Sequence, residues 1–446
     1  EALITKGFYP SPKSVITSLV LCFFKQNKGQ NVMLKDNNKL RSGTVKFWVS
    51  CIMALLIIAL CSSLFLNKNA TKLTIFHHFK KDEKGKILKI LEKIISEFES
   101  EHKAKISLRY VEVTDIWKLN DIPVVDRPDI FIGPYDGSIE NKALLEKVSN
   151  LAPKSINIEK FYDRFFNIKK LLKEPGWNKE LGIPFFKEKV ILFYNKKFMF
   201  NDILKTKSNS VSINQLKQIV KKTRQSKKNI LGIPITNSYY ILPWLYSYGL
   251  EEKKLLDILQ SSDEKQIINV AKKFMKLKTL LLNELNIVIQ DEDVFYKKFI
   301  NGNLAFYMGG SWKVNDIEAN KIDYKIFPLP EIENKTIKPY FGLQSFYITK
   351  KKQSATRKKI IWKLLNKFSS EKMGKKIYEE AKAWSALKNI YRKTEKIKIK
   401  EQFCKNTRLM TTISFGLFRR FNKHMLKSIF KKENKIDDIK MILENL

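Results

Sequence analysis

Apolar and polar residues follow a regular period along most of the chain after position 70. Residues 73–79 form a short apolar run, and residues 84–102 place apolar side chains at i, i+3, i+4 and i+7, which predicts an amphipathic helix. Residues 106–113 alternate with period two, as a strand does. A strand, a helix and a strand at this spacing predict a βαβ unit with a parallel sheet.

The same alternation continues towards the C-terminus. Residues 129–133 predict a third short strand, which ends at a turn around Pro134 and Gly137. Strands and helices alternate to about residue 350, and the pattern beyond it is helical. No tandem repeat or low-complexity tract interrupts them. The sequence therefore predicts an α/β protein.

A different pattern precedes position 70. Residues 47–66 contain no charged side chain, which is the length and character of a transmembrane or signal helix. Basic residues outnumber acidic ones just before this stretch, so the positive-inside bias directs the remainder of the chain outward. We expect residues 33–70 to be a signal peptide or a membrane anchor that holds the protein on the extracellular face of the cell membrane.

Two forms of this anchor are left open. Residues 58–61 resemble the acylation motif of lipoproteins, with Cys61 as the lipidated residue, but Leu60 departs from the small residue expected there. An uncleaved helix is the alternative, and both forms tether the soluble part. The first methionine is Met33, so residues 1–32 are expected to be upstream, non-native sequence.

Composition narrows the class of function. The chain has 446 residues, of which 44% are hydrophobic, enough for two cores. Its formal net charge is +39, but the basic residues are spread along the chain, which favours solvated faces over a nucleic-acid surface. Of the four cysteines only Cys404 follows the apolar stretch, so no disulfide framework is expected, and no metal-ligand spacing occurs.

Five segments occur in a recognisable order. They are 73–112, the RPDIFIG segment 127–133, the GIP segment 182–184 with FYNKK at 193–197, the FINGNLAFYMGGSW segment 299–312, and PYFG at 339–342. Together they resemble the maltose/maltodextrin-binding branch of the extracellular solute-binding proteins of ABC importers. The fourth segment is the most specific of them.

This resemblance implies a periplasmic-binding-protein-like fold, in which two α/β lobes enclose a ligand cleft. The expected lobes are 71–186 and 341–392 for lobe I, and 187–340 with the C-terminal helices 393–446, mainly, for lobe II. Such a protein closes on its solute and delivers it to the subunits of a separate permease. The resemblance thus implies a monomeric sugar-capture protein, which binds an oligosaccharide or disaccharide and no nucleic acid.

The resemblance also implies a set of ligand-binding residues. Carboxylates and amides accept hydrogen bonds from sugar hydroxyls, and aromatic rings stack on sugar rings. The residues at the matching positions are Tyr135, Asp136, Glu188, Asn237, Tyr239, Trp312, Phe415 and Arg420. Three positions depart from the maltose binders: Gly137 stands where they have an arginine, Gly133 where they have an aromatic residue, and Asn237 where they have an acid. The sequence therefore does not predict maltose itself.

The sequence also contains residues that would suit two other functions. His77 and His78 end the first predicted strand, and with the Tyr239–Tyr240 pair they are reminiscent of ferric-ion binders. Asp136 and Glu188 in one cleft would suit a membrane-anchored glycosidase. No nucleophile, phosphate-binding or zinc-hydrolase motif occurs, however. We expect no enzyme, and accordingly no catalytic residue, cofactor or metal site.

Overall fold

The computed structural model describes residues 50–53, 70–79, 86–112, 115, 118–135, 141–165, 181–200, 202–204, 210–223, 230–261, 263–333, 335–351, 353–391, 407–409 and 412–446. The chain divides into two compact units, Glu1–Asn69 and Ala70–Leu446. In the first unit the described residues, 50–53, are helical. Within the described residues, no helix is both long and apolar enough to cross a membrane. Most of the predicted span 47–66, including Cys61, lies outside them.

The second unit opens with the predicted βαβ unit. Strand β1 (Thr71–His77) pairs in parallel with β2 (Ala104–Tyr110), and α3 (Lys86–Glu101) connects them. The apolar face of α3 is buried, as its period indicates. Strand β3 (Ile130–Pro134) then adds to the other side of β1, also in parallel. These three strands confirm the predicted elements to within a few residues at each end.

Ten strands of the described residues form one sheet in the order β2-β1-β3-β10-β4-β6-β5, with β7, β11 and β12 paired at its sides. The sheet is mixed, because β10 runs antiparallel to both β3 and β4. The expectation of an all-helical pattern beyond residue 350 was wrong in two places, where two-residue strands pair with β4 and β10. Two residues are too few to show the period-two alternation of apolar and polar positions that indicates a strand in a sequence. The strands not yet given are β4 (Gly182–Asn195), β5 (Leu231–Gly232), β6 (Phe306–Gly310), β7 (Tyr324–Phe327), β10 (Tyr340–Ile348), β11 (Trp384–Ser385) and β12 (Arg408–Leu409), besides the separate hairpin β8 (Glu331–Ile332) and β9 (Lys335–Thr336).

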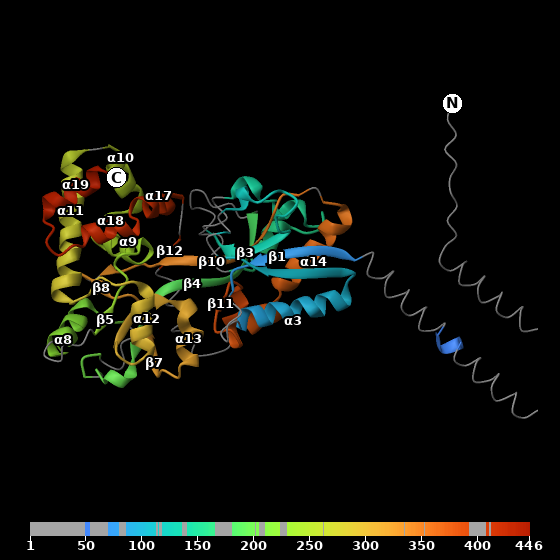
Figure 1. Ribbon diagram of the computed structural model, residues 1–446, viewed down its shortest axis with the longest axis horizontal. Helices are drawn as coiled ribbons and strands as arrows, with labels where there is room; N and C mark the ends of the chain where they lie inside the picture. Colours follow the sequence, from blue (N-terminus) through green and yellow to red (C-terminus); the bar gives the residue numbers. More distant parts are fainter. Residues whose placement is uncertain are drawn as a thin grey trace, which may run out of the picture. The chain divides into compact units, whose positions relative to one another are not determined.

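Helices cover the sheet throughout the second unit. Helices α3 and α14 lie along β1 to β3, whereas α9, α10, α11 and α17 to α19 gather around the other end of the sheet (Figure 1). The remaining helices are α6 (Ile158–Tyr162), α8 (Ile213–Thr223), α9 (Ser238–Ser247), α10 (Glu252–Ser261), α11 (Glu264–Lys278), α12 (Glu292–Ile300), α13 (Val314–Ala319), α14 (Ala355–Phe368), α15 (Glu371–Glu379), α17 (Thr412–Arg420), α18 (Lys423–Ile429) and α19 (Ile436–Glu444).

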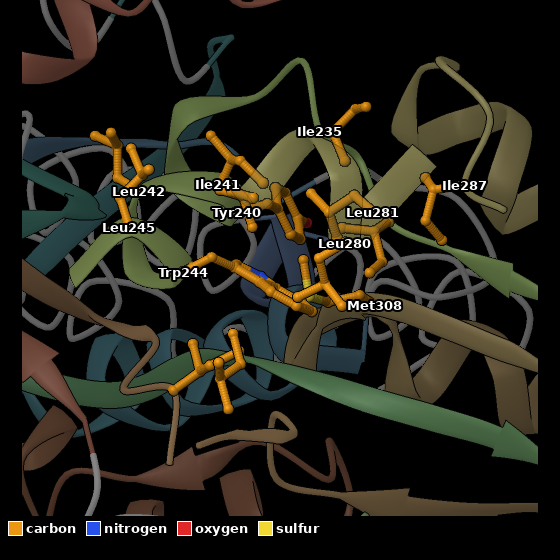
Figure 2. Close-up of a cluster of buried hydrophobic side chains, with 14 of the residues drawn as sticks. Ile235, Tyr240, Ile241, Leu242, Trp244, Leu245, Leu280, Leu281, Ile287 and Met308 are labelled. Carbon is orange, nitrogen blue, oxygen red and sulfur yellow. The ribbon is translucent and has the colours of Figure 1, made fainter. Parts of the chain in front are cut away.

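Two large hydrophobic cores fill the second unit. The first core takes its side chains from 73–186 and 343–387, and the second core from 190–340 and 417–443. Helix α9 is central to the second core, where Tyr240 and Trp244 are fully enclosed among aliphatic side chains of neighbouring segments (Figure 2). Because each core is assembled from two stretches of chain, the chain passes between the cores more than once.

Strands β4 and β10 make two of these passages side by side. Ile183 and Phe186 of β4 pack in the first core, and Val190 and Leu192 of the same strand pack in the second. Strand β10 enters from the second core at Tyr340 and continues into the first. We call β4 and β10 the crossing strands.

A bulge interrupts the pairing of the crossing strands. Gln344 pairs with Phe186 and Ser345 with Pro184, so Phe185 is one extra residue on β4. Proline has no backbone N–H to donate, and prolines inside sheets occur at bulges for that reason. The bulge allows both Phe185 and Phe186 to pack in the first core, although they are consecutive.

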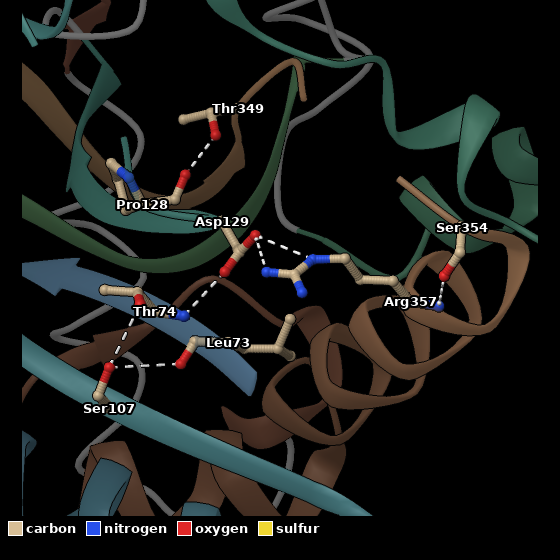
Figure 3. A network of polar contacts seen from close by, with 8 residues as sticks. All are labelled: Leu73, Thr74, Ser107, Pro128, Asp129, Thr349, Ser354 and Arg357. Atoms are coloured by element: carbon tan, nitrogen blue, oxygen red, sulfur yellow. Dashed lines mark hydrogen bonds and ion pairs between the residues drawn. The ribbon is translucent and has the colours of Figure 1, made fainter. Parts of the chain in front are cut away.

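A buried ion pair fixes helix α14 to the start of β3. Asp129 accepts hydrogen bonds from the backbone N–H of Thr74 at 2.8 Å and from Nη2 of Arg357 at 2.7 Å (Figure 3). Thr349, at the end of β10, donates its hydroxyl to the carbonyl of Pro128 in the same group. Three separate segments therefore meet at the RPD turn, which holds the end of the crossing strand in place.

Candidate functional site

The middle of the crossing strands carries charged side chains between the two cores. Glu188 is half-buried on β4 and pairs with Gly342 of β10. The lysines beside it, Lys187 and Lys189, are each only 3% exposed. Nζ of Lys189 lies 5.4 Å from the centre of the Trp384 ring, a cation–π contact. Glu188 is therefore not part of a solvated run of charges, as its sequence neighbours alone could suggest.

A hydrogen-bonded chain runs from strand β1 to Glu188. Nε2 of His78 is 3.0 Å from Oε1 of Gln344, and Nε2 of Gln344 donates to Oε2 of Glu188 at 3.0 Å. His78 follows the C-terminal end of β1, and loops at the carboxyl ends of parallel strands are where α/β proteins place ligands. Burial lowers the pKa of His78, so its ring is neutral at neutral pH.

Four aromatic rings cluster around Tyr340, where strand β10 leaves the second core. Tyr239 stacks on Tyr340 with the ring centres 5.6 Å apart, and its ring centre is 6.2 Å from that of Trp312. Phe418 of α17 meets Tyr340 edge to face at 5.2 Å. We call these four residues the aromatic wall. Two predicted ligand contacts, Tyr239 and Trp312, are thus brought together.

The aromatic wall and Glu188 meet at Gly342. A β-carbon placed on Gly342 would lie 3.6 Å from Cβ of Glu188 and 3.7 Å from the hydroxyl oxygen of Tyr239. A carboxylate and a stacking surface therefore flank one position that has no side chain of its own. Acceptors beside aromatic faces are the combination that binds sugars.

Trp312 lies against Gly310, the glycine that ends strand β6. A β-carbon on Gly310 would collide with the indole ring, so the ring lies directly against the backbone there. The side chain is nevertheless 38% exposed. An indole with one face on the backbone and an exposed remainder suits a platform for a solute, and the FINGNLAFYMGGSW segment supplies both features.

A buried carboxylate supports the aromatic wall from behind. Oε1 of Glu252 accepts hydrogen bonds from the Tyr340 hydroxyl at 2.6 Å and from Ser414 of α17 at 2.8 Å. The Tyr246 hydroxyl lies 2.5 Å from that of Tyr340. Helix α9, helix α10, helix α17 and strand β10 are therefore joined at one polar point directly beneath the ring on which Tyr239 stacks.

A pocket of about 490 Å³ adjoins the aromatic wall in the second core. It lies at the N-terminal ends of α9, α12 and α18, and Phe418 lines it. Asn237, predicted as a ligand contact, caps α9 by accepting from the backbone N–H of Tyr239 at 3.0 Å, and its side chain also lines the pocket. The other polar lining residues include Asp291, Glu292, Asp293 and Lys423.

The remaining predicted residues have different surroundings. Tyr135 is 7% exposed and packs in the first core. Nη1 of Arg420 donates to the backbone oxygen of Leu446. Phe415 belongs to α17, but its side chain is outside the described part of the structure, and so is the whole of Asp136. Their roles as ligand contacts stay predictions.

His77 and Tyr240, two residues of the ferric-ion alternative, are buried in different parts of the fold. Tyr240 is enclosed in the second core, and His77 is buried at the end of β1. Nε2 of His78 is hydrogen-bonded to Gln344.

Sequence reasoning missed Gln344, Tyr340 and Glu252. A signal for Gln344 was present, because it follows Gly342 by two residues on a strand and so shares its face. Glu252 carried no such signal: an acid near the start of a helix is ordinary, and only the fold reveals that it is buried.

Comparison with known proteins gives a consistent result. Residues 93–403 match the family described as bacterial extracellular solute-binding proteins. The galactooligosaccharide-binding protein of Bacillus subtilis (strain 168) is 23% identical over 315 residues, which cover 66% of this chain and 69% of that protein.

Solved structures share the fold. The maltose/maltodextrin-binding domain of Bdellovibrio bacteriovorus bound to maltotriose superimposes with a TM-score of 0.65 at 15% identity, over 84% of this chain and 98% of that one. The maltotriose-binding protein of Thermus thermophilus gives 0.64 at 16% identity, over 84% and 99%. Since the family match spans more than half of the sequence, this chain belongs to the bacterial extracellular solute-binding proteins.

Proposed function

We propose that the protein captures an oligosaccharide or disaccharide between two lobes built on the two cores, and delivers it to an ABC permease. The observation that carries the proposal is the meeting of Glu188 and Tyr239 at Gly342, with the Trp312 ring beside Tyr239, on strands that pass from one core to the other. A hinge at the crossing strands would let the lobes close on the solute. The energy for import would come from a separate ATPase.

Two findings support a sugar as the solute. The Bacillus subtilis relative is named for galactooligosaccharide binding, and two fold neighbours hold maltotriose. The pocket beside Asn237 and Phe418 continues from the aromatic wall, which suits a solute longer than one sugar ring. An aromatic wall with hydrogen-bond acceptors at its edge is chemically matched to such a chain of rings.

We also propose that residues 33–70 tether the unit 70–446 to the outer face of the membrane, through a helix or through lipid on Cys61. The uncharged stretch 47–66 and its basic flank support this. The protein would act there as a monomer.

A thermal-shift screen tests the solute. The unit Ala70–Leu446 has its own cores and can be produced without the preceding residues. It would be screened against maltotriose, a galactooligosaccharide, disaccharides, sugar phosphates, polyols and Fe³⁺. A ligand at a hundred times its Kd adds about 2.7 kcal/mol to the free energy of unfolding.

We expect a saturable shift with one sugar, which Trp312→Ala abolishes. Tyr296→Phe, a change beyond the aromatic wall, is the control and should keep the shift. A shift with Fe³⁺ alone would replace the sugar by a metal, and no shift across the panel would remove the sugar from the proposal.

A further inference from the structure

The amide of Gln344 has neighbours that fix its orientation. Its two ends face His78 on one side and Glu188 on the other, at 3.0 Å each. An ionised carboxylate is acceptor-only, so the amide must turn its NH₂ towards Glu188 and its oxygen towards His78. The opposite orientation would place two acceptors against each other in a site where Gln344 is buried.

The orientation of the amide in turn determines the tautomer of His78. Because Gln344 Oε1 can only accept, Nε2 of the neutral imidazole must carry the proton. Every donor in the chain therefore points towards Glu188: His78 donates to Gln344, and Gln344 donates to Glu188. The three residues come from three strands or strand ends that the fold brings together.

We propose that Gln344 and His78 are positioning residues that hold Glu188 as an oriented acceptor, and thereby select solutes that present a hydroxyl donor beside Gly342. The selectivity rests on the proposed function. The direction of the hydrogen bonds from His78 through Gln344 to Glu188, which we call the one-way chain, does not. A carboxylate has about four acceptor positions, of which Gln344 occupies one. An acceptor that is fixed in this way favours a solute hydroxyl over a group that cannot donate a hydrogen bond.

Nuclear magnetic resonance of the free unit Ala70–Leu446 tests the chain without any solute. With ¹⁵N-labelled histidine near pH 7.5, the His78 ring is assigned by its disappearance in His78→Gln. We expect one tautomer with the proton on Nε2. In Glu188→Gln residue 188 can donate as well as accept, so Gln344 can turn over and both tautomers should appear.

Glu112→Gln is the matched control, because Glu112 is another carboxylate whose charge acts on His78. It should leave the Nε2–H tautomer unchanged. A proton on Nδ1 in the unaltered protein, or an unchanged tautomer in Glu188→Gln, would overturn the chain.

Calorimetric affinity for maltotriose and for a galactooligosaccharide tests the positioning role. Gln344→Leu and His78→Phe should each weaken binding by about tenfold or more, the range of a hydrogen bond to a charged group. His78→Gln supplies an amide donor and should stay within about threefold of the original affinity.

A merely structural role would weaken both His78 variants according to their melting temperatures, without rescue by glutamine. Equal affinity in all variants would also overturn the positioning role. If neither sugar binds the unaltered protein, the sugar assignment fails, while the resonance experiment still decides whether the one-way chain exists.

Discussion

At the scale of single residues, Gly342 and His77 are positions where one side chain, or its absence, should affect a measurable property of the protein. Gly342 leaves space between Glu188 and Tyr239 because it has no side chain. His77 is 3% exposed, and its Nδ1 has no hydrogen-bond partner among the described residues. We expect the first position to affect solute binding and the second to affect the free energy of unfolding.

Substitutions of Gly342 test its expected effect on solute binding. Its β-carbon position has ordinary contact distances, 3.6 Å and 3.7 Å, so Gly342→Ala should fit and change the affinity by about twofold at most. Gly342→Leu fills the space proposed for the solute and should weaken binding by about tenfold or more. Calorimetry with the stabilising sugar measures both. Equal affinities would place the solute elsewhere.

Stability should depend on pH through His77. Burial, and then the neighbouring His78, lower the pKa of His77 below its usual value of 6.5. As pH falls below 6.5 the unfolded chain takes up a proton that the folded chain resists, so the free energy of unfolding should decrease, by at most about 1.4 kcal/mol per pH unit. Urea unfolding between pH 7.5 and 5 measures this loss. His77→Leu should reduce it but leave a remainder, because burial lowers the pKa of His78 as well, and replacement of the exposed His424 by glutamine should not reduce it.

At the scale of elements, two buried carboxylates connect segments that are distant in sequence. Glu252 joins α10 to α17 and β10 beneath the aromatic wall, and Asp129 joins β3 to α14. Each accepts several donors, and this compensates for the loss of water around a buried charge. Removal of a partner should therefore cost more than removal of an exposed ion pair.

Glu252→Leu should lower the free energy of unfolding by about 3 kcal/mol, because it removes the acceptor that the buried Tyr340 and Ser414 hydroxyls share. Glu252→Gln retains an oxygen acceptor and should cost less than half as much. Urea denaturation compares the two. An equal loss in both variants would mean that the charge matters more than the acceptor.

Arg357→Met should cost about 3–5 kcal/mol in free energy of unfolding, since the Asp129 carboxylate is buried and would keep the backbone N–H of Thr74 as its one donor among the described residues. Lys367→Met is the control: its ion pair with Glu101 is largely exposed and should contribute less than about 1 kcal/mol. Similar melting temperatures for the two variants would contradict the difference.

At the scale of the whole molecule, sequence reasoning succeeded where a period or an ordered motif carries the information. The βαβ opening followed from a pattern of that kind, and the family membership agrees with the resemblance. The antiparallel entry of β10 and the short strands β11 and β12 did not, because pairing direction is decided by contacts between distant segments. Gln344 and Glu252 were missed for the same reason: their partners are far away in sequence.

Closure of the two proposed lobes predicts a change of size in solution. Small-angle scattering of the unit Ala70–Leu446 should give a smaller radius of gyration with saturating sugar than without it, because a hinge motion brings the lobes together. Trp312→Ala at the same sugar concentration should keep the larger value. An unchanged radius in the unaltered protein, together with tight binding, would indicate a site that is formed before the solute arrives.

The bulge at Phe185 bears on how sequences of this family should be compared. Side chains of a strand change faces at every residue, so one extra residue lets the two halves of β4 keep independent alternations. Deletion of Phe185 would reverse the alternation of side chains in one half of β4. Either the side chains of the first core or Glu188 would then point to the opposite face of the sheet. Two proteins that differ by this single residue could therefore be almost identical in sequence and still place different side chains on this face of the crossing strands. An alignment that counts outward from the bulge, and not from the start of the strand, pairs the residues that occupy the same place.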